Sequence, residues 1–233
     1  LPPWEVSVRS EIPLARGLGS SASAVVGGLA AANQVLAAGW EHSDLLRLAT
    51  EIEGHPDNVA PALYGGLCVA VSGAAGPVCA PVPVADPPAW VVAIPGFELS
   101  TAKARAALPA VVSLQDAVYN VGRAALLTAA LVSGRHELLI EALSDRLHEP
   151  YRQTLVPGMP EVVSAAKEAG AYGVTLSGAG PTLLAWCSSE HQEAVAHRMA
   201  ASWREAGVEA RAIAVGLGRR GMTIGPALGA ARG

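Results

Sequence analysis

The pattern of apolar and polar positions along the chain alternates between helical and extended periods. Residues 5–10 alternate with a period of two, which predicts a strand leading into a proline- and glycine-bearing loop at 12–21. From Ser21 onward apolar residues recur at helical spacing, which predicts a helix packed along one face. The same spacing recurs over 42–53 and stops at Gly54-His55-Pro56, so a second helix is expected there.

Beyond Asp57 the pattern predicts strands separated by helices. A short helix is expected first, followed by two strands joined by a glycine-rich turn within 65–84. The later predicted elements are a strand at 90–94, helices within 101–108 and 113–132, a broken helical stretch at 136–169, strands at 172–177 and 182–187, a helix at 190–205 and a strand at 208–215. This order favours an α+β fold that ends in a βαβ-like unit.

Three features bear on the domain boundary and the chain ends. The segment Ala85-Asp86-Pro87-Pro88 has the composition of a linker, which predicts a boundary between 1–88 and 89–233. The chain starts at Leu1 in what reads as the middle of a sheet, so we expect a truncated N-terminal subdomain with an exposed sheet edge. The basic, glycine-rich tail from Gly216 is expected to fray.

Composition narrows the classes of function. Sixteen Lys and Arg against 20 Asp and Glu give a net charge of −4, which lacks the basic surface of a nucleic-acid binder. Three cysteines without a CxxC pair predict neither a disulfide framework nor a zinc site, and they favour a reducing cytoplasm. The apolar stretch 22–40 contains Gly27, Gly28, Asn33 and Gln34, which predicts a buried helix and no membrane span.

The sequence Gly17-Leu18-Gly19-Ser20-Ser21-Ala22 lies where the predicted loop meets the first helix. Glycines let backbone approach a ligand closely, and a helix N-terminus offers free N–H groups to an anion. The two serines suit phosphate or Mg²⁺ binding, and Ser20 suits a simple helix cap equally well. No lysine follows the glycines, so this is not a GxxxxGK[ST] loop.

Two further segments carry candidate chemistry. Ionisable residues gather in Glu51-Ile52-Glu53-Gly54-His55-Pro56-Asp57-Asn58, where Glu51 with the loop serines would suit Mg²⁺ beside substrate phosphates. A solvated helix end, with Asp57 capping the next helix, is the alternative interpretation. The segment Thr175-Leu176-Ser177-Gly178-Ala179-Gly180-Pro181-Thr182 is a glycine-rich turn whose amides could close over phosphates, or a bare turn between strands.

In this order and at these separations, the segments resemble the GHMP kinase family. The resemblance covers most of the chain and is carried by IPLARGLGSSASAVVGGLAAAN, EIEGHPDNVAPALYGGL, STAKARAALP, HEPYR and TLSGAGPTLLA. The second of these is most similar to the members that phosphorylate L-homoserine. The resemblance implies an α+β GHMP kinase fold, with an incomplete ATP-binding subdomain like domain 2 of ribosomal S5 that lacks the family's first motif, and a ferredoxin-like C-terminal subdomain.

The resemblance also implies roles for single residues. Ser21 and Glu51 would ligate Mg²⁺, and Thr101 would meet the substrate. Two arginines suit an amino-acid substrate or a transferred phosphate, because a guanidinium grips a carboxylate through parallel hydrogen bonds. The residues implied to bind nucleotide are Pro13, Leu14, Ala15, Arg16, Gly17, Leu18, Gly19, Ser20, Ser21, Ala22, Gly178 and Gly180. Those implied to act on the substrate and in catalysis are Asp57, Asn58, Arg105 and Arg152.

The implied reaction is ATP- and Mg²⁺-dependent phosphorylation of the side-chain hydroxyl of L-homoserine to O-phospho-L-homoserine, in threonine biosynthesis. The chain would be a cytoplasmic phosphotransferase with a small-molecule partner and no nucleic acid, and a homodimer stays open. One alternative is a GHMP kinase acting on mevalonate, a sugar or a terpenoid precursor, and another is a non-catalytic ligand-binding relative. We expect the chain as given to be inactive if its missing first motif carries substrate or adenine contacts.

Overall fold

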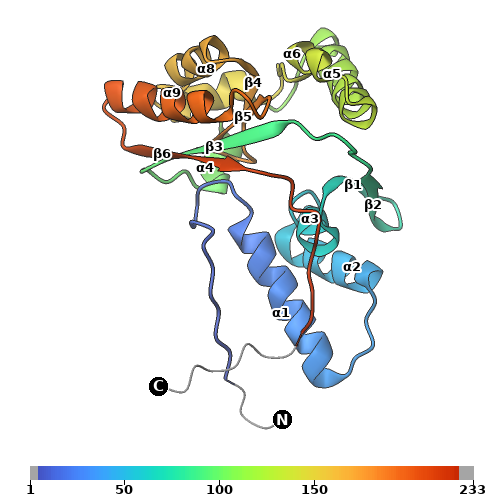
Figure 1. Cartoon of the computed structure of the whole chain (residues 1–233). Helices are drawn as coiled ribbons and strands as arrows, with labels where there is room; N and C mark the ends of the chain where they lie inside the picture. Colours follow the sequence, from blue (N-terminus) through green and yellow to red (C-terminus); the bar gives the residue numbers. More distant parts are fainter. Residues whose placement is uncertain (1–4, 226–233) are drawn as a thin grey trace, which may run out of the picture.

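The N-terminal part of the protein is a small helical layer with one hairpin. The computed structural model describes residues 5–225, and Figure 1 shows the helical layer below a sheet. The layer comprises α1 (Ser20–Leu36), α2 (His42–Glu53), α3 (Val59–Tyr64), β1 (Leu67–Gly73) and β2 (Gly76–Val82). Its core is built from small and branched side chains such as Ala22, Ala49 and Ala60, which let the three helices approach closely.

The C-terminal part carries a four-stranded antiparallel sheet in the order β4-β5-β3-β6. The strands are β3 (Ala89–Pro95), β4 (Ala171–Leu176), β5 (Leu183–Cys187) and β6 (Ala210–Val215). The helical elements are α4 (Thr101–Ala106), α5 (Leu114–Ser133), η1 (His136–Leu138), α6 (Leu139–Ala142), α7 (Glu149–Arg152), η2 (Gln153–Leu155), α8 (Met159–Glu168) and α9 (Gln192–Glu205). Since β3 lies between β5 and β6, this is a split βαβ arrangement, and the expected ferredoxin-like packing is confirmed.

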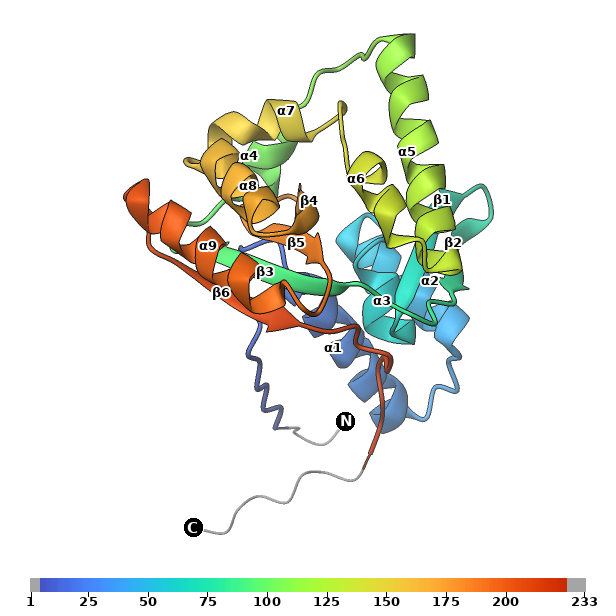
Figure 2. The same cartoon turned by 45° about the horizontal axis from the view of Figure 1, so that its top comes forward.

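Helices α8 and α9 lie side by side on one face of this sheet (Figure 2). The core beneath them includes fully buried Val91, Val162, Met199 and Trp203. The Trp203 indole N–H donates to the carbonyl of Pro157 at 3.0 Å, so its one polar group is satisfied inside the core. This packing places the turn between β4 and β5 at the edge that faces the start of α1 (Figure 1).

Two expectations about the ends of the chain are wrong for the described residues. Residues 5–10 form no strand, and Val6 and Val8 are each 77% exposed, because within the described residues this segment pairs with no neighbouring strand. The tail does not fray over 216–222, because Gly66 N–H donates to Gly218 O at 2.7 Å and Met222 N–H to Leu63 O at 3.1 Å. The parts of these expectations that concern 1–4 and 226–233 lie outside the described residues.

The returning tail connects the end of the sheet with the helical layer. A division into 1–88 and 89–233 stays a prediction, and this contact crosses it. Within residues 5–225, no helix combines the length and the apolar character needed to cross a membrane.

Candidate active site

The loop before α1 has the backbone of an anion site. Gly17 and Gly19 adopt left-handed φ values of 75° and 72°, which residues with a Cβ rarely adopt. Gly19 is the N-cap of α1, so Ser20 already belongs to the helix and does not cap it. The cap makes no side-chain hydrogen bond, which leaves the first N–H groups of the helix free for a ligand.

This loop docks directly on the glycine-rich turn after β4. The Ser177 hydroxyl donates to Gly17 O at 2.7 Å, and Gly180 N–H donates to Ser177 O at 2.9 Å. A Cβ on Gly17 would lie 2.7 Å from the carbonyl oxygen of Gly180, so only glycine fits this position. Backbone contact therefore joins two segments 160 residues apart.

A cavity of about 300 Å³ opens at this junction. Its lining is Ala15, Gly17, Leu18, Gly19, Ser20, Ser21, Ala22, Glu53, His55, Asp57, Asn58, Thr101, Arg105, Arg152, Gly178 and Ala179. We call the wall with Glu53 and Asp57 the acidic side and the wall with Arg105 and Arg152 the basic side. The loop 17–22 lines the same cavity, so carboxylates, guanidinium groups and the free backbone N–H groups at the start of α1 share one cavity.

On the acidic side, Ser21 faces Glu53 and not Glu51. The Ser21 hydroxyl donates to Glu53 Oε1 at 2.5 Å, whereas Glu51 Oε1 accepts from Arg47 at 3.0 Å on the exposed face of α2. Two residues apart on a helix is about 200° of rotation, so only one of the two glutamates can face α1. The expected place of Glu51 in the site is therefore corrected to Glu53.

The helical register of α2 could have indicated Glu53 from the start. Position 53 follows the buried residues Leu46 and Ala49 at spacings of seven and four, so it continues the face that packs on α1. Ile52, the apolar residue just before it, is 62% exposed. The register of α2 therefore favours Glu53, whereas the assignment of Glu51 followed from the resemblance.

Asp57 belongs to the acidic side through local contacts. Asp57 Oδ1 accepts from the backbone N–H of Asn58 at 2.6 Å and from the Asn58 side-chain amide at 2.9 Å. His55 Nδ1 lies 2.7 Å from the same oxygen. The Asp57 carboxylate stays 67% exposed, so it is open to a ligand in the cavity. Within 5–225, no group of three His, Cys, Asp or Glu residues forms a ready-made metal site.

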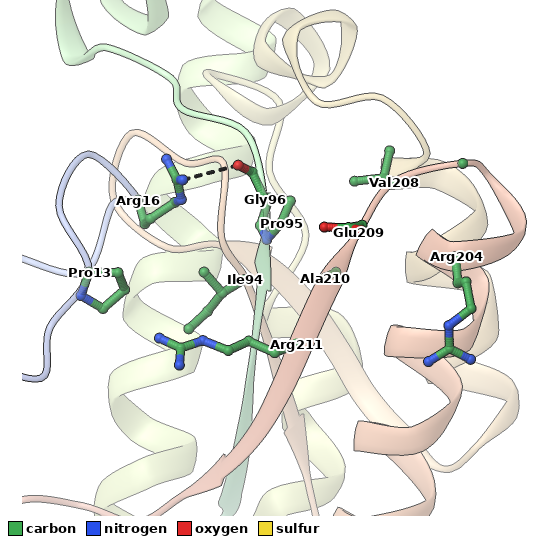
Figure 3. Close-up of a pocket in the computed structure, with 11 residues that line it drawn as sticks. Pro13, Arg16, Ile94, Pro95, Gly96, Arg204, Val208, Glu209, Ala210 and Arg211 are labelled. Atoms are coloured by element: carbon green, nitrogen blue, oxygen red, sulfur yellow. Dashed lines mark hydrogen bonds between the residues drawn. The ribbon is translucent and has the colours of Figure 1, made fainter.

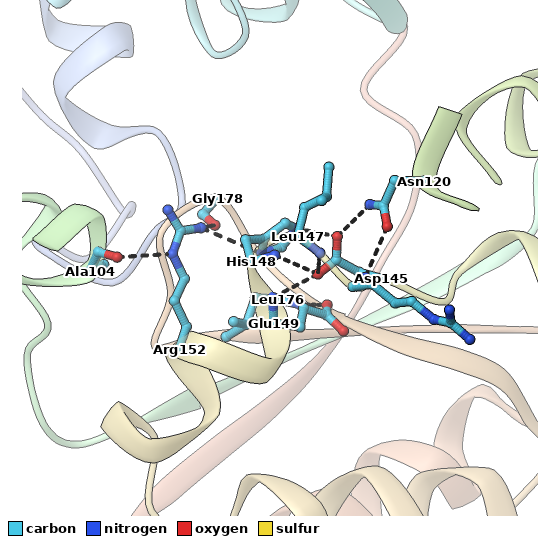
Figure 4. A network of polar contacts seen from close by, with 10 residues as sticks. Ala104, Asn120, Asp145, Leu147, His148, Glu149, Arg152, Leu176 and Gly178 are labelled. Carbon is cyan, nitrogen blue, oxygen red and sulfur yellow. Dashed lines mark hydrogen bonds and ion pairs between the residues drawn. The ribbon is translucent and has the colours of Figure 1, made fainter. Parts of the chain in front are cut away.

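The basic side is built from α4, α7 and the glycine turn (Figure 4). Arg152 donates from Nε to Ala104 O at 3.2 Å and from Nη1 to Gly178 O at 3.3 Å. Burial, and then the nearby charge of Arg105, lower the pKa of Arg152. Thr101 and Arg105 lie one turn apart on α4, on the face toward the cavity. Two cations held this close favour an anionic ligand between them.

Some residues that the resemblance assigned to nucleotide binding do not line this cavity. Pro13 and Arg16 line a different cavity of about 710 Å³ beside β3 and β6 (Figure 3). Arg16 donates from Nη2 to Gly96 O at 3.1 Å, and its Nη1 lies 3.5 Å from Glu98. Leu14 is 74% exposed. Gly180 would place a Cβ 3.0 Å from the Leu176 side chain, so it packs behind the cavity and only Gly178 of the pair lines it.

Comparison with known proteins identifies the GHMP kinases, and among them homoserine kinases, as the proteins that this chain resembles. The model of the GHMP kinases N terminal domain matches residues 2–66, and that of the GHMP kinases C terminal domain matches 127–205. Homoserine kinase of Trichormus variabilis is 48% identical over 222 residues, which cover 95% of this chain and 74% of that protein. Homoserine kinase of Nostoc punctiforme is 48% identical over 94% of this chain and 72% of its own.

A solved structure agrees in fold. The crystal structure of homoserine kinase from Cytophaga hutchinsonii matches with a TM-score of 0.84 and 33% identity, covering 91% of this chain and 69% of that chain. The similarity extends across both the helical layer and the sheet, since nine tenths of the chain is aligned.

Proposed function

Because the chain belongs to the GHMP kinases and, within them, to the homoserine kinases, we propose that it transfers the γ-phosphoryl group of ATP to the side-chain hydroxyl of L-homoserine. The products are O-phospho-L-homoserine and ADP, and the reaction is a step of threonine biosynthesis. One observation carries the proposal: a single cavity brings a free helix N-terminus, two carboxylates and two arginines together.

The loop 17–22 holds the nucleotide phosphates. Its left-handed glycines bring backbone close to the cavity, and the uncapped N-terminus of α1 presents N–H groups and the positive end of the helix dipole. Gly178 and Ala179, from the turn that docks on this loop, also line the cavity. These features bind phosphate without a lysine, so the missing GxxxxGK[ST] lysine is no obstacle.

The residues present fit Mg²⁺. Ser21 and Glu53 bring two hard oxygen atoms within 2.5 Å of each other next to the phosphate loop, and Mg²⁺ prefers one or two protein oxygens together with substrate phosphates. When bound, the cation supplies positive charge that neutralises the phosphates. We assign Ser21 and Glu53, in place of Ser21 and Glu51, as the residues that hold it.

Arg105 and Arg152 bind the substrate's carboxylate or the transferred phosphate, with Thr101 beside them. Arg152 keeps an Nη2 free of the contacts that hold it, so it can donate into the cavity. Asp57 and Asn58 line the same cavity, where they orient the homoserine hydroxyl. The phosphoryl transition state is loose, so positioning and charge neutralisation carry the catalysis and a strong base is not needed.

The proposed location of the reaction is the cytoplasm. Cys68, Cys79 and Cys187 are all free thiols, which fits a reducing compartment. A homodimer stays a prediction.

The test is ADP release by the chain with MgATP and L-homoserine, run in parallel with mevalonate and galactose. We expect turnover with L-homoserine alone, and calorimetry with Mg²⁺ and a non-hydrolysable ATP analogue to show homoserine binding that the Arg152→Ala variant loses. Turnover of another alcohol in its place would overturn the substrate. Nucleotide binding with no binding or turnover of any of the three would overturn the activity.

A further inference from the structure

A carboxylate that the proposed reaction does not use lies behind Arg152 (Figure 4). Asp145 lies on the segment between α6 and α7, and its side chain is 10% exposed. Its Oδ2 accepts backbone N–H groups of Leu147 at 3.1 Å, His148 at 2.8 Å and Glu149 at 2.7 Å. N–H groups at the start of a helix have no acceptor within the helix, so this carboxylate directs the backbone into α7.

Asn120 of α5 holds this carboxylate in turn. Its side-chain amide donates to Asp145 Oδ1 at 2.6 Å, and its carbonyl oxygen accepts the backbone N–H of Arg146 at 2.9 Å. Asn120 therefore grips both the side chain of Asp145 and the backbone that follows it. The contact spans 25 residues and fastens the α7 segment to the long helix α5.

The anchored segment is one turn long and carries Arg152 at its end. Helix α7 has four residues, too few to hold a helical geometry by itself in water. Arg152 N–H donates to His148 O at 3.0 Å, so the position of Arg152 depends directly on the backbone that Asp145 binds. Its guanidinium then reaches Ala104 and Gly178 at the cavity wall.

The charge state of Asp145 suits this task. Burial alone would raise the pKa of Asp145, but the hydrogen bonds from His148, Glu149 and Asn120 outweigh burial and leave the pKa below its ordinary value. The titratable groups near it are His148, whose Nε2 lies 3.7 Å from Oδ1 and whose pKa burial lowers, then Glu149, and Arg152 beyond His148. An ionised carboxylate can accept all four hydrogen bonds at once.

We propose that Asp145 and Asn120 are positioning residues that hold α7, and through it the guanidinium of Arg152, against the active-site cavity. The identity of the group that Arg152 binds there rests on the proposed function. The connection from Asp145 and Asn120 through α7 to Arg152 does not. If Asp145 and Asn120 only stabilised the fold, their substitution would lower kcat/KM whether or not Arg152 is present. If they position Arg152, their substitution lowers kcat/KM only when Arg152 is present.

A double-mutant cycle separates these two roles. We expect Asn120→Ala and Asp145→Asn each to lower kcat/KM for L-homoserine by about ten- to a hundredfold, and by no more than about twofold when Arg152→Ala is already present. Glu141→Gln is the matched control, because it removes a carboxylate contact between α6 and α5, the 3.4 Å pair with Arg123, without touching α7. Equal losses with and without Arg152 would overturn the positioning role.

A second readout does not depend on activity. The Arg152 Nε–H that donates to Ala104 O gives a ¹H–¹⁵N signal, identified by its loss in Arg152→Lys. We expect this signal to move in folded Asn120→Ala and Asp145→Asn and to stay in Glu141→Gln. An unmoved signal in both variants would overturn the inference. A moved signal in a chain that ignores homoserine would leave the positioning role standing and refute only the proposed function.

The exchange D145N/N120D covers the case in which the single variants do not fold. It moves the negative charge to α5 and leaves every donor facing an acceptor, so we expect a folded protein with the Arg152 signal restored. A folded exchange variant without that signal would contradict the inference.

Discussion

The two sides of the cavity differ in how firmly the fold holds them. The acidic side depends on short contacts between exposed groups, such as Ser21 with Glu53 and Asp57 with its neighbour Asn58. On the basic side, Arg152 is fixed by α4, by the glycine turn and by a segment that Asp145 connects to Asn120 of α5. A site whose cations are preorganised spends little free energy on their arrangement, whereas the exposed carboxylates complete their coordination when cation and nucleotide bind.

Removing the cation of the firmly held side should have the largest effect. We expect Arg152→Ala to lower kcat/KM for L-homoserine by about a thousandfold, ~4 kcal/mol, because the ligand loses its charged donor and two carbonyls lose their partner. Steady-state kinetics measures this, with Arg198→Ala as the control, since Arg198 makes a 3.9 Å surface pair with Glu168. A decrease in kcat/KM of less than tenfold would show that Arg152 does not bind the substrate carboxylate or the transferred phosphate.

The second-largest effect is expected at the contact between the loop before α1 and the glycine-rich turn after β4. We expect Gly17→Ala to destabilise the fold by about 3 kcal/mol, because its Cβ would press on the Ser177 and Gly180 carbonyls and φ is positive. Gly27→Ala is the matched control: it lies inside α1 with nothing within 4 Å of the new Cβ, so about 0.5–1 kcal/mol of stabilisation is expected. Urea unfolding measures both, and equal signs would contradict the close docking.

The attachment of α7 to the sheet should depend on pH. Glu149 Oε1 accepts Leu176 N–H at 2.8 Å, and burial raises the pKa of Glu149 to about 7. Asp145 raises this pKa further and Lys167 lowers it. Because the folded-state pKa is above the unfolded value, the stability associated with protonated Glu149 is complete below about pH 4.5 and is lost as pH rises through about 7.

Glu149→Gln should therefore remove this dependence while keeping an acceptor for Leu176. We expect the variant to gain about 2 kcal/mol relative to the parent between pH 4.5 and pH 8, a figure reduced from the full shift because solvent partly screens the carboxylate. Unfolding free energies measured across this range test it. Parallel pH profiles for the two proteins would show that Glu149 titrates as an ordinary glutamate.

The smallest effect is expected on the loosely held side. Glu53→Gln should raise the Mg²⁺ concentration for half-maximal activity by about tenfold, because an amide replaces a charged ligand. Glu51→Gln, two residues away and paired with Arg47, is expected to leave it unchanged. A magnesium titration of the rate compares them, and the opposite ranking would restore Glu51 as the ligand.

Local periodicity was enough to place most elements. The helix predicted at 42–53 matches α2, and the strands predicted at 90–94 and 208–215 match β3 and β6 within two residues at each end. These segments have strong apolar spacing and clear stop signals, so local physics and tertiary packing agree. The alternation at 5–10 was equally clear, but a strand also needs a partner, and that requirement is not written in the segment itself.

The sequence alone determined which residue types serve the chemistry: glycines at a helix start, carboxylates at and just after the end of α2, and arginines at 105 and 152. Because the spacing of residues along the chain determines local backbone conformation, each motif could be recognised from its own residues. The tertiary structure alone decided that Glu53 and not Glu51 meets Ser21, that Arg16 turns to another cavity, and that Asp145 and Asn120 stand behind Arg152. These outcomes depend on which helix face packs against which neighbour, and that choice minimises the free energy of the whole chain and not of any one segment.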